Sequence, residues 1–314
     1  MLRILVTDGI EKTALKRLVN MKFDVVEKHF QKIELIKEIE NFDVLVVRSA
    51  TIVDKDIIDA AYRTKRLKLI IRGGVGVDNI DVDYAKQKGI MVRNTPNASS
   101  ASVAELVIGH IFTMARFIHC ANVSMRKGEW NKNQYKGIEV CGKTLGIIGF
   151  GRIGRETAKK AKALGMKVKF YDITGPMVGN KLYKYCKLDE ILTTSDFISL
   201  HVPFNCGEKA VIGQEEISKM KDGAYLINCA RGGVIDENAL IEALDTGKLA
   251  GAAIDVFEKE PAINPVLLSH ERVSLTPHIG ASTKEAQERI GDEIVDIVYD
   301  FIKGREFDGI AKSI

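Results

Sequence analysis

The sequence predicts an α/β protein with two parallel sheets in tandem, one of which has the marks of a dinucleotide-binding domain. Short runs rich in β-branched residues alternate with helix-forming segments along the chain, a pattern typical of parallel strands joined by crossover helices. The alternation falls into two blocks, and a long helical pattern separates them. A length of 314 residues with 46% hydrophobic content is sufficient for two cores.

The first block supplies five strand-like runs before a turn cluster, NTPNASS, closes it. We expect these strands at 3–8, 23–29, 44–49, 67–73 and 90–94, with helices at 11–19, 32–40, 54–62 and 81–89. A single long helix is expected from about 99 to 127, because serines able to cap a helix open a continuous helical pattern there.

The second block has six strand-like runs. They cover 143–151, 166–172, 197–203, 224–231, 250–257 and 273–278, with helical segments between most of them. A last helix is expected from about 282 to 303, and since it follows the second sheet it can return to the first domain.

Charge and cysteine usage exclude several classes of protein. The formal charge of +4 is small for this length, and no basic stripe with aromatic residues indicates nucleic-acid binding. The cysteines are odd in number, scattered and without a CxxC pair, which indicates reduced thiols and neither a disulfide framework nor a metal site: Cys120, Cys141, Cys186, Cys206 and Cys229. With a strand in place of a targeting segment at the N-terminus and no apolar run long enough to span a bilayer, we expect a soluble cytoplasmic protein without membrane contact.

A glycine motif after the first strand of the second block predicts a nucleotide site. The stretch LGIIGFGRIG places Gly149, Gly151 and Gly154 between a buried-strand run and a helix, where they allow a tight turn, approach of a pyrophosphate and close helix–strand packing. The next strand ends in Asp172, about 20 residues on, where a carboxylate accepts hydrogen bonds from ribose and repels a 2′-phosphate. No arginine follows it directly, so we expect NAD in preference to NADP.

Polar residues at strand ends give candidates for catalysis, because ligands of open parallel sheets bind beyond the carboxyl ends of the strands. Three successive strands of the second block deliver first Arg231, then the carboxylates Asp255, Glu258 and Glu260, and finally His278. An arginine binds a substrate carboxylate bidentately, a histidine exchanges a proton with an alcohol, and a glutamate favours the charged form of that ring. Three unrelated surface charges are the alternative explanation of this spacing.

Four ordered motifs give a family resemblance. GFGRIG, INCARGGVID, GAAIDVFEKEP and LTPHIGAS together resemble the D-isomer-specific 2-hydroxyacid dehydrogenases over nearly the whole chain. The resemblance implies a flavodoxin-like substrate-binding domain of residues 1–95 plus 285–314, a Rossmann NAD-binding domain of residues 96–284, and a homodimer built around the helix after the first sheet. It implies Arg231, Glu260 and His278 as the catalytic residues.

The motifs and the resemblance together imply two sets of binding residues. The expected NAD contacts are Val75, Gly149, Gly151, Arg152, Ile153, Gly154, Asp172, His201, Val202, Pro203, Cys229, Ala230, Arg231, Asp255, His278, Gly280 and Ala281. The expected substrate contacts are Arg48, Ser49, Arg72, Gly73, Gly74 and Lys132, the last of these contributed by a partner subunit. Cations are needed if the substrate carries a phosphate, although a salt bridge within the fold is an equally good explanation of Arg48, Arg72 and Lys132.

Within the family, VVRSAT, RGGVGVDNID and NTPNASSASVAEL resemble the members that oxidise 3-phospho-D-glycerate to 3-phosphohydroxypyruvate, the first step towards L-serine. We therefore expect that reaction. Many of those members continue into a serine-sensing domain, and since this sequence stops at Ile314 we expect no serine feedback. A glyoxylate or hydroxypyruvate reductase, and an NADH-sensing co-repressor that binds peptides, are the alternatives.

The stretch RGGVGVDN also follows a strand but lacks the GxGxxG spacing, and the next strand ends in Asn94 instead of an acidic residue. A second dinucleotide site is therefore not expected. The glycines at 73, 74 and 76 are expected to offer backbone N–H groups to the substrate carboxylate as a small nest, with Val75 touching the cofactor.

Overall fold

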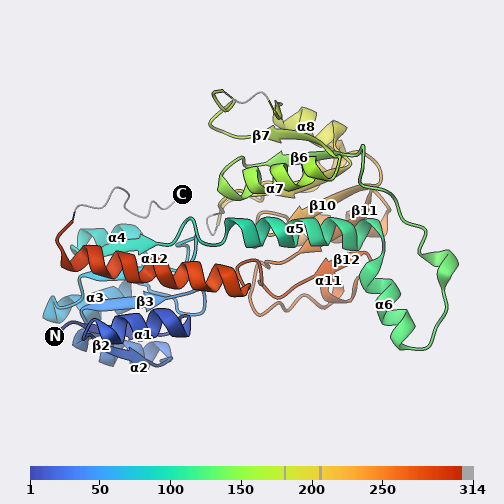
Figure 1. Ribbon diagram of the computed structural model, residues 1–314. Helices are drawn as coiled ribbons and strands as arrows, with labels where there is room; N and C mark the ends of the chain where they lie inside the picture. Colours follow the sequence, from blue (N-terminus) through green and yellow to red (C-terminus); the bar gives the residue numbers. More distant parts are fainter. Residues whose placement is uncertain (180–181, 205–206, 306–314) are drawn as a thin grey trace. The chain divides into compact units, whose positions relative to one another are not determined.

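The computed structural model of the protein describes residues 1–179, 182–204 and 207–305 (Figure 1). The chain divides into two compact units, one of Met1–Ser99 with Ala281–Ile314 and the other of Ser100–Gly280. They are called unit 1 and unit 2 below. Both consist of a parallel sheet with helices, so the α/β class predicted from the alternating sequence pattern is confirmed.

Unit 1 contains a five-stranded parallel sheet in the order β2-β1-β3-β4-β5, which is the flavodoxin-like order. Its strands are β1 (Arg3–Val6), β2 (Asp24–Glu27), β3 (Val44–Val47), β4 (Leu69–Arg72) and β5 (Met91–Asn94). Its helices are α1 (Lys12–Asn20), α2 (Lys32–Glu38), η1 (Ile39–Asn41), α3 (Lys55–Thr64), α4 (Val82–Gln87) and α12 (Lys284–Ile302).

Both faces of the unit 1 sheet are covered, which explains why its strands read as continuous apolar runs. Leu45 and Ile70 point into a core closed by α2, α3 and α4, whereas Val46 and Ile71 point into the core on the opposite face. That second face is covered by α1 and α12, which pack against each other (Figure 1). The last helix of the sequence thus completes the core of the first sheet.

Unit 2 contains a seven-stranded sheet in the order β8-β7-β6-β9-β10-β11-β12, with every neighbouring pair parallel. The first six strands of this order run 3-2-1-4-5-6 in the unit's own sequence, which is the Rossmann order. The strands are β6 (Thr144–Ile148), β7 (Lys167–Tyr171), β8 (Lys184–Tyr185), β9 (Phe197–Leu200), β10 (Ala224–Asn228), β11 (Leu249–Ile254) and β12 (Val273–Leu275).

Alternate residues of the unit 2 strands fill two cores. Ile147 and Ile227 pack with α5 and α7 on one face, while Ile148 and Leu226 pack with the helices α8 to α11 on the other. The helices are α5 (Ser100–Ala115), α6 (Ile118–Arg126), η2 (Lys132–Gln134), α7 (Arg152–Ala163), α8 (Leu188–Thr194), α9 (Gln214–Lys219), α10 (Glu237–Asp245) and α11 (Pro265–Ser269).

The single long helix expected over 99–127 is wrong, because the structure has two helices bent by 65°. Phe117 lies between them in the left-handed region at φ 53°, which ends the regular helix. The carbonyl of Ala115 instead accepts a hydrogen bond from the Ile138 amide at 2.8 Å. This tertiary contact has no local signal in the sequence, and the two-residue strand β8 was missed for the same reason.

No single helix among the described residues is both long and apolar enough to cross a bilayer, although α5 and α6 taken together meet that test despite their bend. Cys120, Cys141, Cys186 and Cys229 are free thiols, and Cys206 lies outside the described residues. The described residues also contain no group of three or more His, Cys, Asp or Glu side chains that could hold a metal ion.

Candidate active site

The carboxyl ends of the unit 2 strands gather most of the residues singled out from the sequence. Because neighbouring strands are parallel, the residues that follow them lie along one edge of the sheet. This edge carries Gly149 after β6, Asp172 after β7, His201 after β9, Cys229 to Arg231 after β10, Asp255 after β11 and Thr276 to His278 after β12.

The glycine loop after β6 requires glycine at two positions for steric reasons. Gly149 has φ 91°, and a Cβ there would lie 2.4 Å from the His201 carbonyl oxygen. A Cβ on Gly154 would lie 2.3 Å from the Gly149 carbonyl oxygen, so this glycine sets how closely α7 approaches the loop. A Cβ on Gly151 would meet nothing within 4 Å, which leaves open space beside the backbone at the start of α7.

This arrangement fits a dinucleotide. The first amides of α7 have no acceptor within the helix, and the helix dipole places partial positive charge at the same end. Gly151 is the residue before the helix, and Arg152 and Ile153 are its first two residues. The open face at Gly151 therefore exposes N–H groups suited to a pyrophosphate.

Asp172 is held by the loops around it. Its Oδ2 accepts from the Phe150 amide at 2.7 Å, and its Oδ1 accepts from the amide and the hydroxyl of Thr174 at 2.9 and 2.7 Å. Partial burial raises the pKa of this carboxyl, but the hydrogen bonds from Thr174 and Phe150 outweigh burial, and the pKa lies below its ordinary value. Asp172 is thus a fixed carboxylate at the end of β7, where the sequence placed it.

His278 and Glu260 form a hydrogen-bonded pair, with 2.8 Å between His278 Nδ1 and Glu260 Oε2. Burial raises the pKa of Glu260, but its contacts with His278 and the Phe257 amide lower the pKa more, so the carboxyl is ionised at neutral pH. An ionised carboxylate only accepts, and so Nδ1 carries the hydrogen. The neutral ring then presents a lone pair at Nε2, as a general base requires.

His278 also has a backbone conformation that is uncommon for a residue with a side chain. Its φ of 54° lies in the left-handed region, which costs a non-glycine residue about 1–3 kcal/mol. Its amide donates to the carbonyls of Asp255 at 2.8 Å and Thr276 at 3.1 Å. The surrounding hydrogen bonds therefore hold the ring of His278 in place through its backbone.

Asn228 shapes the loop that carries Arg231. Its side chain accepts from the Ala230 amide at 3.0 Å and donates to the Arg231 carbonyl at 2.8 Å, while Arg231 Nη1 donates to the Ala230 carbonyl at 2.6 Å. The next residue is Gly232, where a Cβ would lie 1.8 Å from the carbonyl oxygen of Phe257. Glycine here permits contact between the Arg231 loop and the segment at Phe257. The Phe257 amide in turn donates to Glu260 Oε1 at 3.3 Å.

Asp255 connects the ends of β11 and β12. Its side chain is 1% exposed, and Oδ1 accepts from the Thr276 hydroxyl at 2.6 Å and the Ile279 amide at 2.8 Å. Oδ2 accepts from the Gly280 amide at 3.0 Å. These contacts bracket His278, so Asp255 fixes the loop on both sides of it. The sequence indicated Asp255 only as a cofactor contact, and the partner Thr276 was missed.

Two residues of α5 also reach this loop and were missed. The Ser102 hydroxyl donates to the Gly280 carbonyl at 2.6 Å, and the His110 ring contacts the Thr276 hydroxyl at 3.1 Å. A histidine within an apolar helical pattern is the one signal that could have drawn attention to α5.

The loops after β9 and β10 hold the remaining unit 2 residues of the expected cofactor set. Burial lowers the pKa of His201 to about 3, so its ring is neutral, and Nε2 lies 3.0 Å from the Ser199 hydroxyl. Burial raises the pKa of the Cys229 thiol, which keeps the thiol protonated at neutral pH. Val202 is half-buried, Pro203 is exposed and Ala230 is buried, so this stretch offers mostly apolar surface.

The expected substrate residues other than Lys132 belong to unit 1. Arg48 is half-buried and Ser49 exposed after β3, and Arg72 with Gly73, Gly74 and Val75 forms the end of β4 and its loop. The nest expected from the glycines at 73, 74 and 76 is wrong at two of its three amides, because the Gly73 and Gly74 amides already donate to the carbonyls of Val47 at 2.8 Å and Arg72 at 2.9 Å. Neither N–H is available to a substrate anion in this structure.

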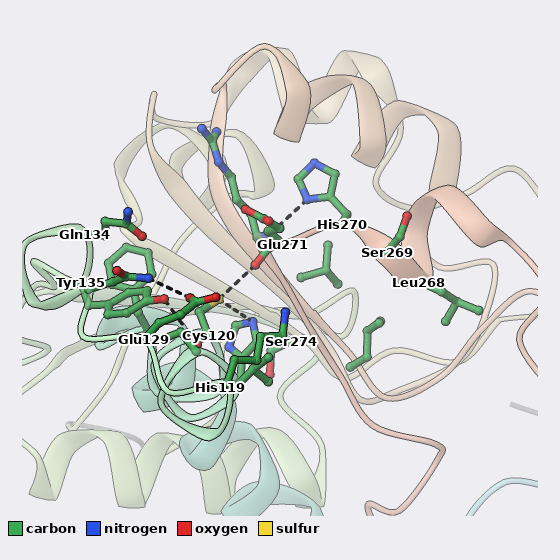
Figure 2. A pocket seen from close by; sticks show the side chains of 18 residues that line it. His119, Cys120, Glu129, Gln134, Tyr135, Leu268, Ser269, His270, Glu271 and Ser274 are labelled. Carbon is green, nitrogen blue, oxygen red and sulfur yellow. Dashed lines mark hydrogen bonds between the residues drawn. The ribbon is translucent and has the colours of Figure 1, made fainter.

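Lys132 is exposed on η2, in a segment beside a pocket of about 880 Å³ (Figure 2). This pocket lies between residues of α6 and η2 on one side and the residues leading into β12 on the other, and none of the three predicted catalytic residues lines it. Within it, Cys120 Sγ lies 3.1 Å from His119 Nε2 and 3.4 Å from the Glu271 carbonyl, and burial raises the pKa of the Cys120 thiol. The raised pKa lowers the fraction of thiolate, the reactive form, at neutral pH.

Comparison with known proteins defines the class. Residues 108–280 match the family model described as "D-isomer specific 2-hydroxyacid dehydrogenase, NAD binding domain". The chain belongs to this family and is an NAD-dependent oxidoreductase, so the resemblance and the cofactor expected from the sequence are confirmed.

Three relatives with different names illustrate the similarity within this class. The chain is 50% identical to the hydroxypyruvate reductase of Thermotoga maritima over 95% of this chain and 97% of that one. It is 46% identical to the D-3-phosphoglycerate dehydrogenase of Methanocaldococcus jannaschii over 97% of this chain, but spans only 58% of that protein. It also resembles the structure of D-lactate dehydrogenase from Aquifex aeolicus complexed with NAD and lactic acid, with a TM-score of 0.84, 33% identity and 96% coverage of both chains.

Proposed function

We propose that the protein is a D-3-phosphoglycerate dehydrogenase, which oxidises 3-phospho-D-glycerate to 3-phosphohydroxypyruvate with NAD as the first step of L-serine synthesis. The observation that carries the reaction type is the 2.8 Å hydrogen bond between His278 and Glu260 at the strand edge that also bears Arg231. Sequence similarity to the archaeal dehydrogenase supports the substrate.

In this mechanism His278 is the general base. Its Nε2 takes the proton of the C2 hydroxyl, and Glu260 stabilises the ring as it becomes charged because the carboxylate accepts from Nδ1. The guanidinium of Arg231 binds the substrate carboxylate and polarises the forming carbonyl. When bound, NAD supplies the acceptor for the hydride that leaves C2. General acid–base catalysis of this kind is worth about 10²–10⁴-fold in rate.

The proposed phosphate ligand is Arg48. Its side chain is partly buried and lies near the carboxylate of Asp8. Burial lowers the pKa of the guanidinium, and the charge of Asp8 raises it by less. No hydrogen bond from this guanidinium to another described residue is present, and its Cγ would lie 3.6 Å from a Cβ on Gly73. A partly buried arginine without a bidentate partner is suited to a phosphate.

A hydroxypyruvate reductase is the second candidate, and the observation that favours it is the 50% identity to the Thermotoga maritima protein over almost its full length. Such an enzyme would use the same three residues without a phosphate ligand. In a site built to bind a polar group, a substrate that lacks the group can have a kcat/KM lower by about 10⁴-fold. The two candidates therefore predict very different ratios of kcat/KM.

The experiment compares 3-phosphohydroxypyruvate with hydroxypyruvate as oxidants of NADH. We expect a much higher kcat/KM for the phosphorylated acid, and we expect Arg48→Met to lower that value selectively by about 10–100-fold. Arg63→Met, which removes an exposed arginine of α3, serves as the control. Equal or better turnover of hydroxypyruvate by the unchanged protein would establish the second candidate instead.

We further propose a cytoplasmic homodimer formed through α6 and the segment that follows it. Exposed apolar side chains are concentrated here: Val123 is 50% exposed, Met125 52% and Trp130 78%. A second copy of the chain would cover them. Trp130 is the only tryptophan, so its fluorescence should shift to the blue on association, and Trp130→Ser with Met125→Ser should halve the mass measured by light scattering. A monomeric unchanged protein would refute the dimer.

A further inference from the structure

His110 is a buried titratable group to which the mechanism above gives no role. It lies in the middle of α5 with 3% exposure, surrounded by apolar residues of the core. Its two ring nitrogens contact hydroxyl groups of the β12 region, Nδ1 with Ser274 at 3.0 Å and Nε2 with Thr276 at 3.1 Å. Both nitrogens are therefore satisfied although the side chain is removed from solvent.

The direction of every hydrogen bond in this group follows from one carboxylate. Asp255 only accepts, so the Thr276 hydroxyl donates to it across 2.6 Å. The Thr276 oxygen then accepts from His110, which places the ring hydrogen on Nε2 and leaves Nδ1 to accept from the Ser274 hydroxyl. Burial lowers the pKa of His110, so the ring is neutral and the chain of donors keeps this direction.

This series of hydrogen bonds ends at the backbone of the loop that carries His278, the proposed general base. Asp255 accepts from the amides of Ile279 and Gly280, and its own carbonyl accepts from the amide of His278. A carboxylate that rotates would release these amides together, and the hydrogen bond from Thr276 to Oδ1 opposes that rotation. The orientation of Thr276 in turn depends on the ring hydrogen that it accepts from α5.

We propose that His110 is a positioning residue for the general base: through Thr276 and Asp255 it fixes the backbone of His278. The proposal rests on the role given above to His278. The Ser102 hydroxyl holds the Gly280 carbonyl from the same helix, so α5 supports the loop at both ends. His110 touches no reacting atom in this account.

Two substitutions separate this role from simple filling of the core. His110→Gln keeps a donor for Thr276 and an acceptor for Ser274, whereas His110→Met fills similar volume and supplies neither. Misplacing a reacting group by about 1 Å can cost about 10²-fold in rate. We expect His110→Met to lower kcat for NADH oxidation about 10–100-fold with KM for the 2-oxo acid changed less than about twofold, and His110→Gln to retain most of kcat.

A double-mutant cycle tests whether the effect passes through Thr276. Thr276→Val should lower kcat, and His110→Met added to Thr276→Val should lower it little further. Multiplied losses in the double variant would show that His110 acts by another route and would overturn the proposal. Equal losses for His110→Met and His110→Gln would also overturn it, because a donor at this position would then be irrelevant.

Controls make the outcome independent of folding and of the proposed function. Ser195→Ala removes another buried hydroxyl of unit 2 and should leave kcat unchanged. Thermal unfolding of each variant identifies loss of kcat caused by unfolding, and His110→Gln provides a milder change if His110→Met does not fold. His278→Ala in the same series tests the general base itself, so a failure of that role is recognised separately from a failure of the His110 role.

Discussion

Asp255→Asn is a small change in volume with a large expected effect. The carboxylate accepts three hydrogen bonds, from Thr276, Ile279 and Gly280, and is almost completely buried. An asparagine can keep its oxygen towards Thr276 and Ile279, but its NH₂ group then faces the Gly280 amide. Two donors would then point at each other across the 3.0 Å where the carboxylate now accepts.

The magnitude follows from these contacts. Hydrogen bonds to a charged acceptor contribute about 1.5–3 kcal/mol each and neutral ones about 1 kcal/mol. In Asp255→Asn the bond from Gly280 is lost, and the bonds from Thr276 and Ile279 are weakened because their acceptor is no longer charged. A buried amide left without an acceptor adds to this cost. We expect the free energy of unfolding to fall by about 2–4 kcal/mol, which lowers the thermal midpoint of a unit of this size by about 5–10 °C.

Thermal melting followed by circular dichroism measures the loss of stability, and kcat for NADH oxidation measures the effect on catalysis. Because the same three bonds hold the strained backbone of His278, kcat should fall by about 10²-fold or more. Asp236→Asn is the control: Asp236 caps α10, and asparagine is an equally good cap. Unchanged stability and turnover in Asp255→Asn would refute the account of how the His278 loop is held.

Three further predictions concern Asp172 and Gly232. Asp172→Asn removes the charge that repels a 2′-phosphate, so the ratio of kcat/KM for NADP to that for NAD should rise by about tenfold or more; an unchanged ratio would contradict this role. The pKa of Asp172 is lowered in the folded state, so its stabilising effect is complete above the ordinary carboxyl pKa and is lost as the pH falls through the folded value. The difference in unfolding free energy between the unchanged protein and Asp172→Asn should therefore narrow on acidification from about pH 6 to pH 3, and a widening difference would show the sign to be wrong. Gly232→Ala would place a Cβ 1.8 Å from the Phe257 carbonyl and should abolish most turnover, whereas Gly109→Ala in α5, where a Cβ meets nothing within 4 Å, should be neutral or stabilising.

The sequence was sufficient for the parts of the site that depend on local pattern. Strand runs, glycine spacing and the residues directly after strands are short-range features, and parallel pairing brings those strand ends to one edge without further information. Asp172 and His278 were found in this way, as was the glycine loop at Gly149.

Features that depend on contacts between distant segments could not be predicted. The break at Phe117 accompanies a hydrogen bond between Ala115 and Ile138, and the contact of His110 with Thr276 joins residues far apart in the chain. Such contacts exist only once the sheet has assembled. The expectation that the Gly73 amide binds a substrate anion was wrong for a related reason, since this amide donates to the carbonyl of Val47 in the neighbouring strand.

The central claim is that His278, held by Glu260, is the base of an NAD-dependent 2-hydroxyacid dehydrogenase. The most direct measurement is kcat for NADH oxidation by His278→Ala beside the unchanged protein, with 3-phosphohydroxypyruvate and hydroxypyruvate in turn, together with NADH binding by fluorescence. The account predicts a loss of about 10²–10⁴-fold with the preferred acid while NADH binding is retained. Turnover close to that of the unchanged protein would contradict it.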